Sequence, residues 1–373
     1  MIIKDNGFQN KETVLGKEPK IVFGEQAWVQ LETDIINGKF KKVIIVTDTF
    51  LNEKGLKLFA GRDIPSNVIF VNGPDLKTGS KYITVDQLSG YYSFGDLDGA
   101  DCVVGFGGGV NVDQAKMIAR STGAKLFLAP TKPSAAIASE SASIETKQGR
   151  ISLDTPEIGC IYAKNIEIPK FLITAEVGDM LSGLTANFDT VLGKKFLSES
   201  VNMSLLAQAD LIAFETMKLE DPIVDRLSEI YSLEVRIGMI GRAYESTRPW
   251  SGIEHMFSHT VDSVLPNEKH SMHGIQVAFG VLMGFALQTE YMKLKGLNRS
   301  DFGLRDFSFE DVKNFYIKMG LPVSLSEIKL NIDDFTVVMS KIRTIREKHR
   351  YTILDQYTDE AIILVLEKYD LLK

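Results

Sequence analysis

The sequence predicts an α/β N-terminal domain with a mainly parallel, Rossmann-like sheet, followed by an all-α C-terminal domain. Apolar β-branched runs alternate with amphipathic segments between residues 20 and 110, whereas helical spacing with few strand signals dominates after residue 172. The chain has 373 residues, which is too many for one ordinary core. We therefore expect a dinucleotide-binding domain over residues 1–170 and a helical, metal- and substrate-binding domain over residues 171–373.

Short apolar runs mark the expected strands of the first domain. Four segments have the composition of buried parallel strands: IVFGE, KKVIIVTD, SNVIFVN and ADCVVGFGGG. Between the first two, WVQLETDII is amphipathic like a helix. Residues 147–168 are rich in Ile, Thr and Gly, so we expect them to hold a hairpin or edge strands and the interdomain linker. In the second domain the expected helices are Leu205–Lys218, Arg226–Ser246, Ile275–Lys295 and Asp359–Leu372.

Composition and charge exclude several classes of protein. The formal net charge is −7 and no run of Lys and Arg is interleaved with aromatic residues, so nucleic acid is not an expected partner. The longest apolar stretch, Val277–Leu287, is too short to span a bilayer. The N-terminal residues do not resemble a signal peptide, and the only cysteines are Cys102 and Cys160, so we expect a cytoplasmic protein. The sequence leaves a homo-oligomer possible.

A glycine-rich segment, GFGGGVNVDQAKMIA (Gly105–Ala119), follows an apolar strand and leads into a helix. Gly107, Gly108 and Gly109 would let the backbone approach a ligand closely, and the helix N-terminus offers amide hydrogens to a pyrophosphate. The alternative is an ordinary strand-to-helix turn, in which Asp113 only complements the helix dipole and Lys116 lies on a solvated face.

Asp48 directly follows the strand KKVIIVTD. A carboxylate in that place accepts hydrogen bonds from an adenosine ribose and repels a 2′-phosphate, which favours NAD over NADP. The alternative is an Asp that forms a turn.

Four of the five histidines fall in one 19-residue window: His255, His259, His270 and His273. His255 and His259 are four residues apart and would share one face of a helix. Neutral imidazoles bind zinc or iron(II), and a catalytic zinc usually has three protein ligands, so a third ligand, such as a carboxylate, is expected elsewhere in the chain. The alternative is a set of histidines packed or solvated around a loop.

Three segments carry a resemblance to a known family: GGGVNVDQAK, EVGDMLSGLTANFD, and STRPWSGIEHMFSH followed by HG. They resemble motifs of the polyol dehydrogenases in the dehydroquinate synthase-like superfamily, which includes glycerol dehydrogenase, the iron-containing alcohol dehydrogenases and sn-glycerol-1-phosphate dehydrogenase. The resemblance implies metal ligands at Asp179, His255 and His273, with Asp179 and His259 as catalytic residues. It also implies dinucleotide contacts at Asp48, Gly107, Gly108, Gly109, Asp113, Lys116, Thr131, Ser134 and Ser139.

Some positions depart from the family's pattern. Ala136 stands where relatives carry an Asp that binds a substrate hydroxyl, and Glu140 is the nearest acid that could replace it. Ile275 stands where relatives have Glu. These departures indicate an altered substrate. Gly183 stands where iron-using relatives add a histidine, which favours zinc over iron.

The resemblance implies a metal-dependent oxidoreductase that transfers hydride between NAD(H) or NADP(H) and the alcohol or carbonyl group of a small polyol or polyol phosphate. Arg248 and Lys116 are candidate partners for a substrate phosphate, unless each forms an ordinary ion pair. One alternative is a sugar-phosphate cyclase of the dehydroquinate synthase type, against which Gly178-Asp179 argues because cyclases place Glu there. The other is a non-catalytic homologue that still binds NAD and metal, which the altered SAAIAS segment supports.

Overall fold

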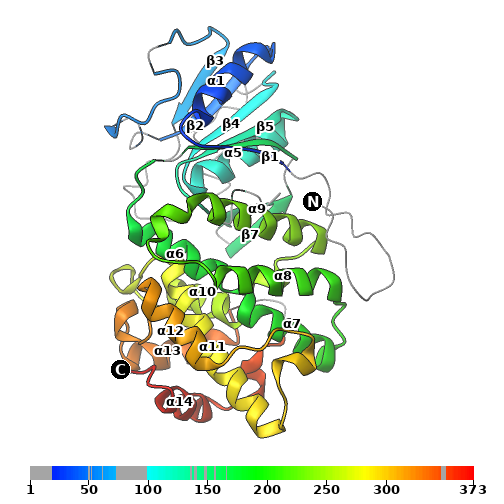
Figure 1. Cartoon of the computed structure of the whole chain (residues 1–373), viewed down its shortest axis with the longest axis vertical. Helices are drawn as coiled ribbons and strands as arrows, with labels where there is room; N and C mark the ends of the chain where they lie inside the picture. The colour runs from blue at the N-terminus through cyan, green and yellow to red at the C-terminus, as the bar shows by residue number, and fades with distance from the viewer. Residues whose placement is uncertain are drawn as a thin grey trace. The chain divides into compact units, whose positions relative to one another are not determined.

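The computed structural model describes residues 19–48, 51, 53–60, 62–72, 99–134, 137, 141–146, 149–154, 157–164, 166–345 and 350–373. The chain divides into two compact units (Figure 1). Unit 1 holds the described residues up to Ile168 together with Leu227–Arg242, and unit 2 holds Pro169–Arg226 and Ala243–Lys373.

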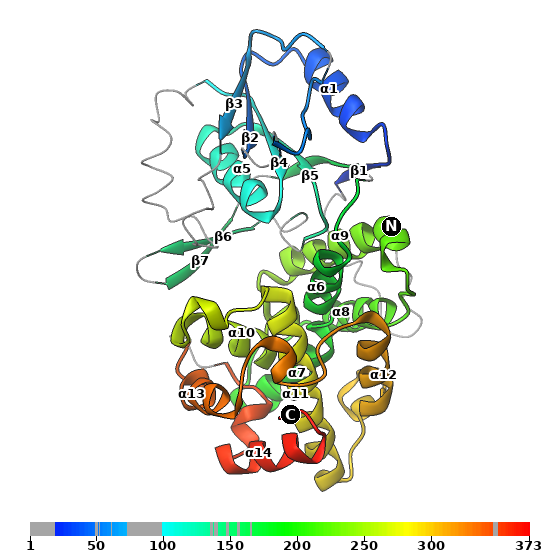
Figure 2. The same cartoon turned by 90° about the vertical axis from the view of Figure 1, so that its left-hand side faces the viewer.

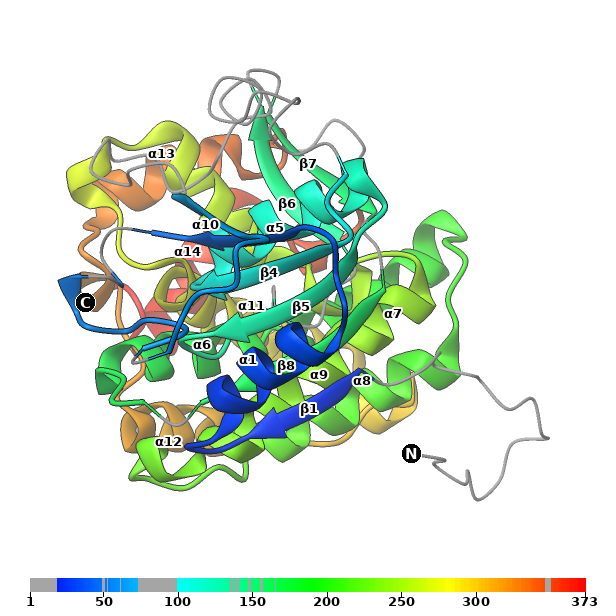
Figure 3. The same ribbon diagram turned by 90° about the horizontal axis from the view of Figure 1, so that it is seen from above.

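Unit 1 is built on a parallel six-stranded sheet in the order β1-β8-β5-β4-β2-β3. Figure 3 shows β4, β5, β8 and β1 side by side. The strands are β1 (Lys20–Phe23), β2 (Val43–Thr47), β3 (Val68–Asn72), β4 (Cys102–Gly107), β5 (Lys125–Pro130) and β8 (Ile158–Ala163). The sheet and the helical unit 2 confirm the predicted fold class.

Apolar side chains cover both faces of this sheet, as expected for parallel strands. On one face Val103 and Leu126 pack with helix α5 (Gly109–Thr122) and with Tyr231 of helix α9 (Leu227–Tyr244). On the other face, Val104 packs with helix α1 (Ala27–Asn37). Because α5 begins directly after β4, the glycine-rich turn lies at the carboxyl edge of the sheet.

Residues 147–168, which were expected to hold a hairpin or edge strands, contain one strand of a hairpin and one strand of the main sheet. An antiparallel hairpin is formed by β6 (Ser141–Thr146) and β7 (Gly149–Asp154), as Figure 2 shows. The next strand, β8, is not an edge strand, because it pairs with β1 on one side and β5 on the other. Its residues Ile158 and Ile161 are buried in the sheet core, which explains why an inner position suits it.

Unit 2 consists of helices joined by short 3₁₀ turns. Its helices are α6 (Lys170–Met180), α7 (Gly183–Leu197), α8 (Met203–Thr216), α10 (Ile253–Val264), α11 (His273–Lys295), α12 (Phe309–Met319), α13 (Ile332–Ile342) and α14 (Asp359–Lys368). α11 contacts α6, α7, α10, α12 and α14, and most of its residues are buried. A helix that is apolar on all sides is expected at the centre of a bundle.

Helix α9 differs from the predicted division of the chain. This segment was expected in the second domain, over residues 171–373, but Leu227–Arg242 belongs to unit 1. Tyr231 and Val235 are buried against the sheet, and the Tyr231 ring lies 5.8 Å from that of Phe23. Helical spacing predicts a helix but does not reveal which core its apolar face joins.

Within the described part of the chain, no helix combines the length and apolarity that crossing a bilayer requires.

Candidate metal centre and dinucleotide-binding turn

Three helices of unit 2 bring Asp179, His255 and His273 together. Asp179 lies in the last turn of α6, His255 in the first turn of α10, and His273 begins α11. Each can offer one ligand atom such that the three atoms lie within 4.8 Å of one another. All three residues are partly exposed, so the cluster is accessible to a small molecule.

Close backbone contacts allow this convergence. A Cβ added at Gly274 would lie 1.9 Å from the carbonyl oxygen of Ala175, so α11 touches α6 where a side chain has no room. A Cβ added at Gly280 would lie 2.7 Å from the Cα of Glu254, so α11 approaches α10 equally closely. Glycine at these two positions therefore sets the helix spacing that the cluster needs.

His255 is held through both ring nitrogens. Its Nε2 lies 3.3 Å from Oδ1 of Asp179, and its Nδ1 lies 3.2 Å from Oε1 of Glu254. Glu254 is fully buried and also accepts a hydrogen bond of 2.7 Å from Oγ1 of Thr185. Burial alone would lower the pKa of His255, but the hydrogen bonds to Asp179 and Glu254 outweigh it and raise the pKa to about 9.

His273 is held by a neutral group. Its Nδ1 lies 2.9 Å from Oγ of the buried Ser258. Nδ1 of each of these two histidines is thus held by a polar partner, which is the usual arrangement around metal-binding imidazoles. One carboxylate oxygen and two imidazole nitrogens are a donor set that fits a divalent transition metal.

The other two histidines of the window differ in position. The ring centroid of His259 lies 5.9 Å from that of His255 and 5.6 Å from that of His273, so His259 stands beside the cluster. His270 lies outside it, and its Nε2 contacts the carbonyl oxygen of Leu265 at 2.9 Å. His270 therefore holds the end of α10 in place.

In unit 1 the glycine-rich turn has an open helix N-terminus. Gly107 adopts φ +144°, which only glycine accommodates readily, and Gly108 caps α5 without a side-chain hydrogen bond. The carbonyl of Gly107 accepts a hydrogen bond of 3.0 Å from the backbone N–H of Thr131. The first amides of α5 and the loop after β5 therefore meet at one edge of the sheet, as an anion cradle requires.

Asp48 lies at the same edge, and the protein already uses both of its oxygens. Oδ1 accepts a hydrogen bond of 2.9 Å from the backbone N–H of Leu51, and Oδ2 accepts one of 2.7 Å from Nδ2 of Asn111. The first contact is the turn-forming role that the sequence left open. The second ties the loop after β2 to α5, so Asp48 stands in a fixed position next to the glycine-rich turn.

Lys116 and Arg248, the two candidate phosphate partners, both form ion pairs within the protein. Lys116 is completely buried and lies 3.4 Å from Asp113, so it is not on a solvated face. Arg248 forms an ion pair of 3.0 Å with Glu199 and donates to the carbonyls of Asp189 and Tyr351. That network favours the ion-pair interpretation of Arg248 over a phosphate contact. The carbonyl of Ser134 accepts a hydrogen bond of 2.9 Å from the backbone N–H of Ile137. Ala136, Ser139 and Glu140 lie outside the described residues.

Three residues that support the cluster were not predicted from the sequence: Glu254, Ser258 and Gln276. All three are fully buried polar side chains. Glu254 adjoins a proposed ligand, and Ser258 and Gln276 each lie three residues from a histidine of the cluster. That spacing within the EHMFSH and HGIQ segments is the signal that could have revealed them.

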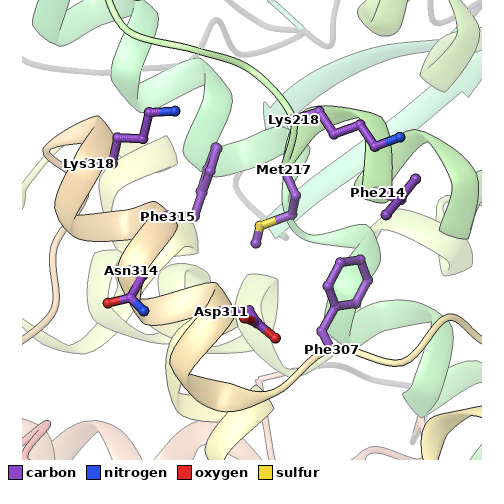
Figure 4. Close-up of a pocket in the computed structure, with 8 residues that line it drawn as sticks. All are labelled: Phe214, Met217, Lys218, Phe307, Asp311, Asn314, Phe315 and Lys318. Carbon is purple, nitrogen blue, oxygen red and sulfur yellow. The ribbon is translucent and has the colours of Figure 1, made fainter.

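A separate groove of about 400 Å³ lies between α8 and α12 (Figure 4). Phe214, Met217, Phe307 and Phe315 form its apolar part, and Lys218 and Lys318 stand at its rim. None of the residues predicted for the functional site lines this groove.

A glycine-rich turn on a parallel sheet suits a nucleotide phosphate, and a carboxylate–imidazole cluster suits a divalent metal ion. Residues 22–161 match the family model described as iron-containing alcohol dehydrogenase. The glycerol-1-phosphate dehydrogenase of Methanothermobacter thermautotrophicus is 31% identical over 266 residues, covering 69% of this chain and 71% of the relative. That of Methanococcus maripaludis is 30% identical over 286 residues, covering 73% and 80%.

Solved structures share the fold. A probable glycerol dehydrogenase from Sinorhizobium meliloti aligns with a TM-score of 0.65 at 19% identity, covering 94% of this chain and 97% of that one. Sulfoacetaldehyde reductase from Bifidobacterium kashiwanohense, in complex with NAD+, aligns with a TM-score of 0.61 at 14% identity, covering 95% and 97%. The chain belongs to the iron-containing alcohol dehydrogenase family, and it is an oxidoreductase of the alcohol dehydrogenase class.

Replacing Gly274 with Ala tests the close helix contact. The new Cβ would meet the Ala175 carbonyl at 1.9 Å, so α6 and α11 must separate. We expect a loss of about 1–3 kcal/mol in the free energy of unfolding and at least about tenfold weaker zinc binding, measured by denaturation and chelator competition. Gly241→Ala is the control, because a Cβ there meets nothing within 4 Å. Unchanged zinc affinity in Gly274→Ala would contradict this account.

The raised pKa of His255 predicts how metal affinity depends on pH. Below about pH 9 the metal-free protein holds a proton on His255, and a metal must displace it because a ligating imidazole is neutral. Zinc affinity should therefore rise about tenfold per pH unit from pH 7 and level off near pH 9, whereas an ordinary histidine would level off near 6.5. In Glu254→Gln the levelling point should move to lower pH. An affinity that is flat above pH 7 in the unaltered protein would contradict the assignment.

Proposed function

We propose that the chain is an NAD(P)-dependent dehydrogenase that holds one divalent metal ion and acts on a small polyol or polyol phosphate. The observation that carries the proposal is the cluster of Asp179, His255 and His273, with the second nitrogens of both imidazoles held by Glu254 and Ser258. The glycerol-1-phosphate dehydrogenases to which it is similar are NAD(P)+-dependent by name. Those names support the choice of cofactor and substrate class.

The residues of the cluster have separate tasks. Asp179, His255 and His273 hold the ion, which when bound supplies Lewis acidity toward the oxygen of the alcohol or carbonyl group. His259, one helical turn after His255, contacts the substrate and passes a proton to or from that oxygen. An imidazole has two ring nitrogens that can donate or accept, so it can exchange this proton with solvent between turnovers.

The dinucleotide binds at the carboxyl edge of the sheet in unit 1. Its pyrophosphate lies over Gly107, Gly108 and Gly109, where the first amides of α5 point outward. Asp48 accepts hydrogen bonds from the adenosine ribose. The remaining contacts proposed for the dinucleotide are Asp113, Thr131, Ser134 and Ser139. Lys116, also expected from the sequence to contact it, is completely buried and lies against Asp113 instead.

We propose zinc as the resident ion, although the family name refers to iron. The donor set suits both metals. A Cβ at Gly183 would lie 2.6 Å from the Trp250 ring, so this position leaves no room for an additional ligand side chain. A three-ligand site that keeps one position open is typical of catalytic zinc.

A reducing compartment fits the two cysteines, which are both free and buried, so a cytoplasmic location stays part of the proposal. We also propose that the chain forms a homo-oligomer, and sedimentation equilibrium measures that oligomeric state.

The central test combines metal analysis with turnover. Purified protein should contain one zinc per chain and oxidise NADH with a small carbonyl compound, and Asp179→Ala should lose both properties. Because Ala136 replaces the acid that binds a hydroxyl in relatives, some compound less hydroxylated than dihydroxyacetone phosphate should be reduced with greater efficiency. A metal-containing protein that turns over no carbonyl compound would favour a non-catalytic role, and a protein that binds neither metal nor NADH would end the proposal.

His259→Ala separates proton transfer from metal binding. Its zinc content should remain, because His259 is not one of the three ligands, while turnover at saturating substrate should fall about 10²-fold or more. Steady-state kinetics over a pH series measures this effect. An unchanged turnover number would restrict His259 to a packing role.

Asp48→Asn tests the preference for NAD over NADP. An Asn oxygen can still accept from the N–H of Leu51, while the negative charge that repels a 2′-phosphate is removed. We expect the ratio of kcat/KM for NADPH to that for NADH to rise about tenfold. Asn111→Ala breaks the contact with Asp48 without changing its charge, and it should leave that ratio nearly constant. Equal ratios in Asp48→Asn and in the unaltered protein would reduce Asp48 to a turn residue.

A further inference from the structure

A chain of hydrogen bonds leads away from His273 into the interior of unit 2. Nδ1 of His273 lies 2.9 Å from Oγ of Ser258, and that hydroxyl lies 2.7 Å from Oε1 of Gln276. Nε2 of Gln276 lies 3.0 Å from Oδ1 of Asp262 and 3.2 Å from the carbonyl oxygen of Ser271. Ser258 and Gln276 are completely buried, so water does not compete for the contact between them.

The far end of this chain fixes the direction of every bond in it. An ionised carboxylate and a backbone carbonyl can only accept, so the Gln276 amide nitrogen must face Asp262 and Ser271. The amide oxygen then faces Ser258 and must accept, which uses the single hydroxyl hydrogen of Ser258.

The direction of these bonds determines the tautomer of His273. Since Ser258 has given its hydrogen to Gln276, its oxygen can only accept from His273, so the proton of a neutral His273 must be on Nδ1. Nε2 then keeps its lone pair and is the nitrogen available for a metal. Without an acceptor at position 276, the Ser258 hydroxyl could donate to His273 and favour the opposite tautomer, whose Nε2–H cannot bind a metal.

We propose that Gln276 and Asp262 are positioning residues that set the ligating tautomer of His273 through Ser258. The proposal rests on the proposed function, because it assigns His273 as a metal ligand. His255 is held differently: its Nδ1 contacts a carboxylate directly, and no intermediate group chooses its tautomer.

Gln276→Met tests this role, since it keeps the length of the side chain and removes the acceptor. We expect zinc affinity, measured by chelator competition, to fall about 10- to 100-fold. We also expect the ¹⁵N shifts of His273 in metal-free protein at pH 9.5 to change from the Nδ1–H tautomer toward Nε2–H.

Gln288→Met is the matched control. Gln288 is also a fully buried glutamine on α11, but its amide nitrogen donates to the carbonyl of Thr185 instead. It should lose stability as Gln276→Met does, while zinc affinity and the tautomer of His273 stay unchanged. If Gln276→Met fails to fold, Ser258→Ala replaces it and should give mixed tautomers with weaker zinc binding.

The possible results separate the two proposals. An Nε2–H tautomer in the unaltered metal-free protein, or zinc affinity within twofold of the unaltered protein in Gln276→Met, would overturn the positioning role. An unaltered protein that binds no zinc would overturn the proposed function, and the tautomer measurement would still decide whether Gln276 orients His273.

Discussion

The close contact of α11 with α6 and α10 is the constraint on which the rest of unit 2 depends. Asp and His are short side chains, and metal–ligand bonds of about 2 Å leave little tolerance in where their backbones lie. Gly274 and Gly280 let the three helices approach until Asp179, His255 and His273 offer atoms within 4.8 Å of one another. The apolar surface of α11 then supplies the burial that keeps them at that spacing.

The two histidines of the cluster meet different electrostatic surroundings. His255 lies against the buried carboxylate of Glu254, whereas His273 lies against the neutral hydroxyl of Ser258. Asp179 and Glu254 thus place two carboxyl groups against the ring of His255. The hydrogen bonds to Asp179 and Glu254 make the first imidazole a strong base, with its pKa raised to about 9.

Local patterns predicted much of this molecule. Apolar runs located β2, β3 and β4, because strands follow from neighbouring residues. The gathering of four histidines in one window indicated a metal site, and the family resemblance implied Asp179, His255 and His273, which lie together in the structure. Long-range pairing was less predictable: the inner position of β8 and the packing of α9 depend on which surfaces meet in three dimensions. The buried ion pair of Lys116 and the acceptor chain through Gln276 were missed for the same reason.

The placement of α9 has a consequence for the order in which the protein is made. The chain leaves unit 1 after Ile168, returns for Leu227–Arg242 and leaves again, so the core beneath the sheet is completed by a segment synthesised much later than the strands. While the ribosome is still adding α6, α7 and α8, the surface that Tyr231 and Val235 will cover is open. A gene fragment that stops after β8 would encode every strand of the sheet but leave that apolar surface uncovered, so a soluble version of unit 1 needs α9 appended to it.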